Sequence, residues 1–299
     1  ELITIGYEDY NYYLTTSTGK YCVKIFSKIR TKEDIKNYLD RIRAVANSEI
    51  NSPKPLIVND DITLTLDYKN NHYDICVFEY INGKNYFELE EKPSKDIIKE
   101  IARQTAMINN LDIKPNFIYD TWAIVNFGDE YKKKREYLSD RYKSEFDKLL
   151  VELNKTDFEN LPKAFVHGDI ISTNVMLDNN SKIWIIDFAV SNYLPRIIDL
   201  AVIACNMCLD EKSKNNTYDN ISVLLSEYNK YNQLTKYELK VFGTFYKLAN
   251  AMHILQPQYI IQMDGDSEEN QYWLNEGIIG YSYSEDETFE KAIIKRLEK

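Results

Sequence analysis

One segment near the middle of the chain carries the residue types that phosphoryl transfer requires. His167, Asp169 and Asn174 follow the spacing H-x-D-x-x-x-x-N, and Asp187 ends an apolar stretch thirteen positions after the asparagine. A carboxylate on such a loop can accept the proton of a substrate hydroxyl, and carboxylate and amide oxygens are the ligands that Mg²⁺ takes beside nucleotide phosphates. A single Asp or Asn in a loop is usually only a turn former. Their joint occurrence at this spacing predicts a catalytic loop.

The elements around this segment predict an α+β fold with two lobes. Residues 1–81 contain about five strand-like stretches and one helix, which begins at Thr31 with Asp34 three residues later. Residues 82–299 are mainly helical, with the clearest periodicity over 97–109 and 129–153 and a short strand pair around the catalytic segment. We therefore expect a small β-rich lobe over 1–81 and a larger, mainly helical lobe over 82–299.

Composition limits the class of protein. The chain has 37 Lys and Arg against 47 Asp and Glu, a net charge of −10, which argues against a nucleic-acid partner. No apolar run reaches the roughly 18–20 residues of a membrane span. The four cysteines indicate free thiols in a reduced compartment, so we expect a cytoplasmic protein. Cys205 and Cys208 have half the spacing of a zinc site, and we interpret them as core thiols.

The catalytic segment resembles that of a known group. Gly168 stands where protein kinases usually carry Arg, and Asp187-Phe188 is followed by Pro195 and then Asp199-Leu200-Ala201. In these motifs the chain resembles the aminoglycoside phosphotransferase, choline kinase and homoserine kinase superfamily, which are small-molecule kinases with a protein-kinase-like fold. The last spacing is similar to type II homoserine kinases and spore-coat kinase-like members. The resemblance implies a small antiparallel N-terminal sheet with one helix and a larger helical lobe. Residues 1–81 would then be the nucleotide-binding lobe, and residues 82–299 the catalytic and substrate-binding lobe.

The resemblance also implies roles for individual residues. Asp169 would be the catalytic carboxylate, and Asn174 and Asp187 the Mg²⁺ ligands. His167 would brace the loop by hydrogen bonding and would not act as a base. Asp199 would be a buried acid that holds the backbone of the catalytic loop, although it could instead be the N-cap of the following helix.

The predicted phosphate-binding lysine is Lys24, which interrupts the apolar strand 21–26. In the family this lysine pairs with a glutamate on the next helix, but here the ungapped alignment puts Tyr38 at that place. Asp40 is the substitute candidate, although it lies about 200° further around the helix. The sequence therefore leaves the partner of Lys24 open.

Two further nucleotide contacts follow from the resemblance. The covering loop from Gly6 to Asn11 has one glycine, so small polar groups such as Asn11 and backbone N–H groups would hold the phosphates. The adenine would bond to the hinge backbone at Glu79, Tyr80 and Ile81, which could otherwise be a plain sheet edge.

The predicted function is ATP- and Mg²⁺-dependent transfer of phosphate to a hydroxyl group of a small metabolite. The leading class of acceptor is an amino alcohol or hydroxy amino acid of the homoserine or choline type. Four acids in the C-terminal lobe could attract a cationic substrate, or could form a solvated loop: Asp264, Asp266, Glu268 and Glu269. An aminoglycoside is the alternative acceptor. A catalytically silent, kinase-like structural or coat protein is the alternative from another class, suggested by Tyr38.

The chain begins at Glu1, directly as a strand, whereas family members generally carry a short helical segment first. We therefore expect residues ahead of Glu1 in the native gene product.

Overall fold

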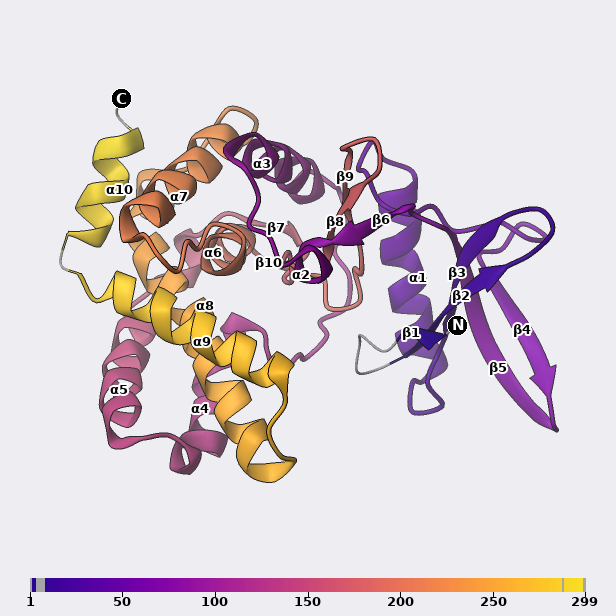
Figure 1. The fold of residues 1–299 in the computed structure, drawn as a ribbon, viewed down its shortest axis with the longest axis horizontal. Helices are drawn as coiled ribbons and strands as arrows, with labels where there is room; N and C mark the ends of the chain where they lie inside the picture. Colours follow the sequence, from indigo (N-terminus) through magenta and orange to yellow (C-terminus); the bar gives the residue numbers. More distant parts are fainter. Residues whose placement is uncertain (1, 4–8, 287, 298–299) are drawn as a thin grey trace.

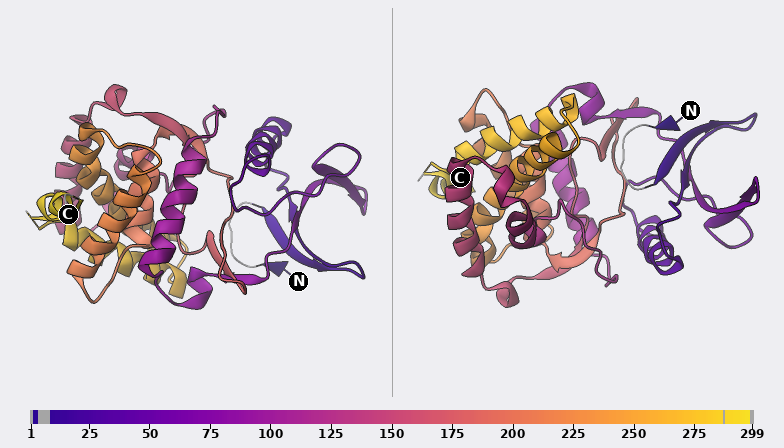
Figure 2. Two further views of the ribbon diagram at one scale, coloured as in Figure 1. Left: turned by 90° about the horizontal axis from the view of Figure 1, so that it is seen from above. Right: turned by 90° about the horizontal axis from the view of Figure 1, so that it is seen from below.

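The computed structural model describes residues 2–3, 9–286 and 288–297. A β-rich part and a larger helical part lie side by side, and few segments of the chain pass between them (Figure 1, Figure 2). The predicted boundary between residues 81 and 82 lies in the connection between β5 and β6 and remains a prediction. Among the described residues, no helix is both long and apolar enough to cross a membrane.

The β-rich part is a five-stranded sheet in the order β1-β2-β3-β5-β4, with every neighbouring pair antiparallel. Its strands are β1 (Leu2–Ile3), β2 (Tyr10–Thr15), β3 (Lys20–Ile25), β4 (Thr63–Tyr68) and β5 (Asn71–Glu79). The register sets Lys24 between Asn11 on β2 and Cys76 on β5. The sheet therefore holds the predicted lysine from both sides.

One helix, α1 (Lys32–Ala46), packs beside this sheet. Its start is the predicted one, because Thr31 Oγ1 accepts the Asp34 N–H while the Asp34 carboxylate accepts the Thr31 N–H. The apolar face buries Leu39, Ile42 and Val45.

Short strands frame the catalytic segment. They are β6 (Gly83–Asn85), β7 (Lys163–Val166), β8 (Val175–Asp178), β9 (Ile183–Ile185) and β10 (Asn192–Pro195). β7 pairs with β10, and β8 pairs with β6 and β9. β7 ends immediately before His167 and β8 begins immediately after Asn174, while β9 ends two residues before Asp187. Strand ends thus place all the residues of the motif.

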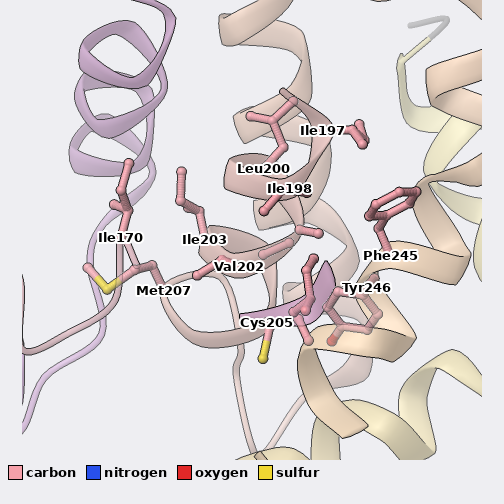
Figure 3. Close-up of a cluster of buried hydrophobic side chains, with 14 of the residues drawn as sticks. Ile170, Ile197, Ile198, Leu200, Val202, Ile203, Cys205, Met207, Phe245 and Tyr246 are labelled. Atoms are coloured by element: carbon pink, nitrogen blue, oxygen red, sulfur yellow. The ribbon is translucent and has the colours of Figure 1, made fainter. Parts of the chain in front are cut away.

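Helices form the rest of the structure. Those described are α2 (Tyr86–Leu89), α3 (Lys95–Asn109), α4 (Phe127–Lys134), α5 (Asp140–Asn154), α6 (Ile197–Asn206), α7 (Lys214–Asn229), α8 (Lys236–Met263), α9 (Glu268–Ser284) and α10 (Phe289–Leu297), with 3₁₀ turns at Ile124–Asn126, Arg135–Tyr137 and Phe158–Asn160. Every residue of α6 is buried. Ile170 of the catalytic loop belongs to the same buried cluster as Ile203 and Met207 (Figure 3). This core anchors the loop. Cys205 and Cys208 are buried in it, as predicted.

The prediction of one helix over 129–153 is wrong. The chain leaves the helical conformation at Leu138, and the Ser139 hydroxyl caps a new helix. The break lets Tyr131 and Phe146 pack at 5.8 Å between ring centroids. In one straight helix these residues would lie about 22 Å apart along the axis, because each residue adds about 1.5 Å. Burial of the aromatic rings therefore outweighs continuation of the helix.

Candidate active site

A cleft between the β-rich and helical parts contains most of the residues that the sequence predicted. It encloses about 570 Å³, within the range of about 300–1,000 Å³ that is usual for ligand sites. Eight predicted residues line it: Asn11, Lys24, Glu79, Tyr80, Ile81, Asp169, Asn174 and Asp187. His167 and Asp199 are fully buried and lie outside the lining.

The catalytic loop closes on itself through Asn174. The Asn174 Nδ2 donates to the Asp169 carboxylate at 2.7 Å and to the Asp169 carbonyl at 3.0 Å. Gly168 precedes this contact with a φ of +85°, a conformation that L side chains rarely adopt. The glycine therefore lets the chain turn Asp169 toward Asn174.

Asp169 has an unusual electrostatic environment. Burial, followed by the charges of Asp120 and Asp187, raises the pKa of Asp169 to about 7, although the hydrogen bond from Asn174 opposes the shift. A carboxyl group with a pKa near neutrality is suited to accept a proton at physiological pH.

His167 lies beneath the loop and links it to the segment after β9. Its Nδ1 accepts the Asp169 N–H at 3.2 Å, so the proton is on Nε2, which donates to the Ile186 carbonyl at 3.0 Å. Burial lowers the pKa of His167 to about 4, so the ring is neutral at pH 7. With both nitrogens engaged inside the protein, His167 connects the positions of Asp169 and Asp187.

Asp199 holds the start of the loop from the opposite side. Its carboxylate accepts the backbone N–H groups of His167 at 3.1 Å and Gly168 at 2.8 Å, and the Asn109 side-chain amide at 2.8 Å. It is the third residue of α6, so the alternative reading as an N-cap is wrong. Burial raises the pKa of Asp199 to about 6, although the hydrogen bonds from these three donors oppose the shift.

Removing the Asp199 carboxylate should destabilise the fold. Asp199→Ala leaves the backbone N–H groups of His167 and Gly168 without their acceptor and removes one of the two hydrogen bonds of the Asn109 amide, which keeps its bond to the Phe165 carbonyl. Each unmade bond costs about 1–3 kcal/mol. We expect a loss of about 3 kcal/mol or more in the free energy of unfolding, measured by equilibrium urea denaturation. Asp199→Asn is the matched control, because it keeps the shape and one oxygen acceptor and should lose less. A loss below about 1 kcal/mol for Asp199→Ala would contradict this.

Asn174 and Asp187 present oxygen atoms to the cleft. The Asn174 amide donates through Nδ2, which leaves its Oδ1 available as a ligand. Burial would raise the pKa of Asp187, but the charge of Lys24 and the Ala189 N–H outweigh it and hold the pKa below its usual range. One amide and one ionised carboxylate suit a hard divalent cation whose other ligands are phosphate oxygens and water. Within the described ranges, no group of three His, Cys, Asp or Glu side chains forms a metal site by itself.

Lys24 lines the cleft, and its ammonium group lies close to two carboxylates. Its Nζ lies 3.6 Å from Asp9 Oδ2 and 4.0 Å from Asp187 Oδ2. Asp40 is exposed and pairs with Arg43, so the candidate suggested by the sequence is not the partner of Lys24. The sequence offered no signal for Asp9, because the ion pair depends on the pairing of β2 with β3.

Comparison with known proteins identifies the class. The profile of the phosphotransferase enzyme family matches residues 1–223. The chain belongs to this family. The resemblance inferred from the catalytic motif is therefore confirmed, and with it the prediction of an ATP-dependent small-molecule kinase.

Individual relatives of this phosphotransferase are distant. A homoserine kinase of Zymomonas mobilis subsp. mobilis is 22% identical over 246 residues, which cover 80% of this chain and 74% of the relative. A solved amicoumacin kinase has a TM-score of 0.69 at 16% identity, covering 96% of this chain and 88% of its own. A microcompartment-associated aminopropanol kinase has a TM-score of 0.65 at 13% identity, covering 99% and 94%. These structures confirm the protein-kinase-like α+β fold.

The predicted hinge of the phosphotransferase is held by the segment after α1. The Glu79 N–H donates to the Lys54 carbonyl at 3.0 Å, and the Glu79 carboxylate accepts the Lys54 N–H at 2.9 Å. The Ile81 carbonyl accepts the Gly83 N–H at 3.0 Å. Tyr80 packs edge-on against Tyr13, with ring centroids 5.4 Å apart. Hydrogen bonds to Lys54 therefore hold the segment of Glu79, Tyr80 and Ile81, three residues that line the cleft.

The other end of the cleft in this phosphotransferase is aromatic and acidic. Trp122, His253 and Trp273 line it, with His253 6.2 Å from Trp122 and 5.2 Å from Trp273 between ring centroids. Burial and then the charge of Lys92 lower the pKa of His253 to about 4, so the His253 ring, like the two Trp rings, carries no charge at pH 7. We call these three rings the aromatic wall. Asp120 and Glu269 provide carboxylates there.

Sequence reasoning missed most of this end. Of the four acids that it proposed, Glu269 lines the cleft, whereas the other three are exposed outside its lining. Asp120, Trp122 and His253 lie on segments far apart in the sequence, with no shared motif.

Proposed function

We propose that the chain transfers the γ-phosphoryl group of Mg²⁺-bound ATP to the hydroxyl group of a small amino alcohol or hydroxy amino acid. The observation that carries this proposal is the acceptor end of the cleft, where Asp120 stands close enough to Asp169 to raise its pKa, beside a neutral aromatic wall. A carboxylate and aromatic faces together favour an organic ammonium group. An acceptor whose ammonium lies at Asp120 brings a hydroxyl near Asp169.

Each residue of the catalytic motif has a role in this proposal. Asp169 accepts the hydroxyl proton, while His167 and Asp199 keep the loop in place. Asn174 and Asp187 hold Mg²⁺, which would neutralise the charge that develops on the phosphates. Lys24 donates to the phosphates. The contacts given above for Asp169, Asn174 and Lys24 support these assignments.

In this proposal the two lobes have different roles. Residues 1–81 form the nucleotide-binding lobe, with Asn11 at the phosphates and the backbone of Glu79, Tyr80 and Ile81 at the adenine. Residues 82–299 form the catalytic and acceptor-binding lobe. The free cysteines and the requirement for ATP support the cytoplasm as the place of action.

The comparisons support the class of acceptor. Homoserine and aminopropanol, named in two of the relatives, each carry one amino group and one hydroxyl group. The amicoumacin kinase was solved with AMP-PNP and Ca²⁺, which supports a nucleotide with a divalent cation here. The identities of 22% or less leave the compound itself to experiment.

ADP release measured against a panel of acceptors tests the proposal. The panel includes L-homoserine, 1-amino-2-propanol, choline and ethanolamine, with kanamycin for the aminoglycoside alternative and glycerol as an uncharged alcohol. We expect Mg²⁺-dependent turnover with one or more small amines, and none with glycerol. Turnover restricted to kanamycin or glycerol would contradict the proposed acceptor. Calorimetric binding of ATP without any turnover would favour the catalytically silent alternative.

Neutralising Asp120 should weaken binding of an amine acceptor. Asp120→Asn keeps the oxygen that accepts the Trp122 N–H at 3.0 Å but removes the charge. Hydrogen bonds to a charged group contribute about 1.5–3 kcal/mol, so we expect the KM for the acceptor to rise about 10- to 100-fold with little change in the KM for ATP. Glu268→Gln is the matched control, because Glu268 is an exposed acid outside the cleft lining. An equal effect of both variants would rule out a direct contact.

A further inference from the structure

The helix that usually supplies the partner of the phosphate-binding lysine supplies a neutral ring in this protein. Tyr38 on α1 is buried, and Lys24 Nζ lies 5.4 Å from the centroid of its ring. The ring packs edge-on against Phe26, which follows β3. A ring face stabilises a cation by about 0.5–2 kcal/mol but cannot balance its charge.

The acids of α1 are engaged elsewhere. Asp34 forms the capping box with Thr31 at the start of the helix. Asp40 is exposed and pairs with Arg43 at 3.3 Å. The third acid, Glu33, lies 3.5 Å from the Asn116 side-chain amide. The anion beside Lys24 therefore comes from outside the helix.

Asp9 supplies that anion from the segment before β2. Its side chain is 1% exposed, and its Oδ2 lies 3.6 Å from Lys24 Nζ. The other oxygen, Oδ1, accepts the Ser27 N–H at 3.1 Å and the Arg30 Nε–H at 2.8 Å. Ser27 and Arg30 follow β3, the strand that carries Lys24. Oδ1 is thus fixed by the turn after β3.

The second oxygen of Asp9 is left for the lysine. Oδ2 is buried and accepts no hydrogen bond from any residue in the described part of the chain. A buried ammonium without an ionic partner is costly, and so is a buried carboxylate oxygen without a donor. The two costs offset each other when Lys24 and Asp9 face one another.

We infer that Asp9 is the positioning residue for Lys24, in place of a glutamate at the position of Tyr38 on α1. The inference rests on the proposed role of Lys24 at the phosphates. Ion pairs with Asp9 and with Asp187 together hold the ammonium group of Lys24 in place at the cleft. Without Asp9, the carboxylate left within 4.0 Å of Lys24 Nζ in the described part of the chain is Asp187, the proposed metal ligand. The lysine would then compete with the cation for that carboxylate.

The change of partner also changes what α1 does. Arg41 on α1 is fully buried and donates from Nε to the Ser191 carbonyl at 2.8 Å and from Nη2 to the Asn116 carbonyl at 2.9 Å. These two hydrogen bonds of Arg41 therefore link α1 to the larger lobe, close to the catalytic segment. The position of Lys24 depends instead on the hairpin of β2 and β3.

Asp9→Asn tests the inference. We expect the KM for ATP to rise about tenfold or more, and the Mg²⁺ concentration for half-maximal rate to rise with it, because Lys24 shifts toward Asp187. Asp40→Asn is the matched control on α1 and should leave both within twofold. A shift in the Mg²⁺ requirement is a readout that a merely structural role would not produce. Values within twofold of wild type for Asp9→Asn would overturn the inference.

A double-mutant cycle keeps the test decisive if Asp9→Asn folds poorly. Lys24→Met removes the charge that Asp9 balances, so its addition to Asp9→Asn should restore stability in urea denaturation. Equal instability with and without Lys24→Met would show that Asp9 acts only through Ser27 and Arg30, which overturns the inference. If the wild-type protein neither binds nor turns over Mg²⁺-bound ATP, the proposed function fails instead. That result is distinguishable, because it appears before any substitution at Asp9.

Discussion

Asp169→Asn is expected to lower kcat about a thousandfold while the affinity for Mg²⁺-bound ATP changes by less than about threefold. Asparagine keeps the shape and one oxygen for the Asn174 Nδ2, but it cannot accept the hydroxyl proton. General-base groups contribute about 10²- to 10⁴-fold to rate, which sets the expected size. The kcat comes from the ADP-release assay, and the affinity from calorimetry on the same preparations.

Asp178→Asn provides the control for this substitution. Asp178 ends β8 and lies outside the cleft lining, so the same chemical change should leave kcat within about twofold. Activity of Asp169→Asn above a tenth of wild type would remove Asp169 from the role of base.

The pH profile gives the same prediction an independent readout. Asp169 acts only when ionised, and its pKa is raised to about 7, so the rate should fall as the pH drops through this value. Mg²⁺ bound at Asp187 would neutralise one of the charges that raise the pKa, so the acid limb of the loaded enzyme lies at or below pH 7. Asp120→Asn removes the other charge and should move the limb to lower pH. A profile that is flat between about pH 5 and 8, the interval around the raised pKa of about 7, would contradict this.

Asp187→Ala should abolish the dependence of ATP binding on Mg²⁺. The substitution removes the charged one of the two proposed oxygen ligands, so we expect the Kd for Mg²⁺-bound ATP to rise about 100-fold, as for the loss of about 2.7 kcal/mol. Binding of metal-free ATP should be unchanged or tighter, because Lys24 loses a competing carboxylate 4.0 Å away. Calorimetric titrations with Mg²⁺ and with EDTA measure both quantities.

Two further variants delimit the effect of Asp187→Ala. Asn174→Ala removes a neutral ligand and should act in the same direction with a smaller change. Asn180 lies in the exposed turn between β8 and β9, so Asn180→Ala should change neither titration. If ATP bound the wild-type protein equally well with and without Mg²⁺, this account of the site would fail.

Local spacing was sufficient to predict that the residues of the proposed catalytic loop lie together. Asp169 lies two residues from His167 and five from Asn174, and both contacts form within this short segment. The helix start at Thr31 was also predictable, since a capping box spans four consecutive residues. Such contacts depend on short stretches of chain with few available conformations, so their residue types are visible in the sequence.

Packing between distant segments decided the rest. Asp199 meets Asn109 across 90 residues, and Asp9 faces Lys24 only because β2 and β3 pair. The predicted helix over 129–153 breaks because its aromatic residues bury more surface when α4 and α5 fold together. Local propensity contributes only about a few tenths of a kcal/mol per residue, whereas burying an aromatic side chain contributes about 1.5–3 kcal/mol. Where local propensity and burial compete, tertiary packing therefore decides where a helix ends. Tertiary packing also decides which carboxylate lies beside Lys24.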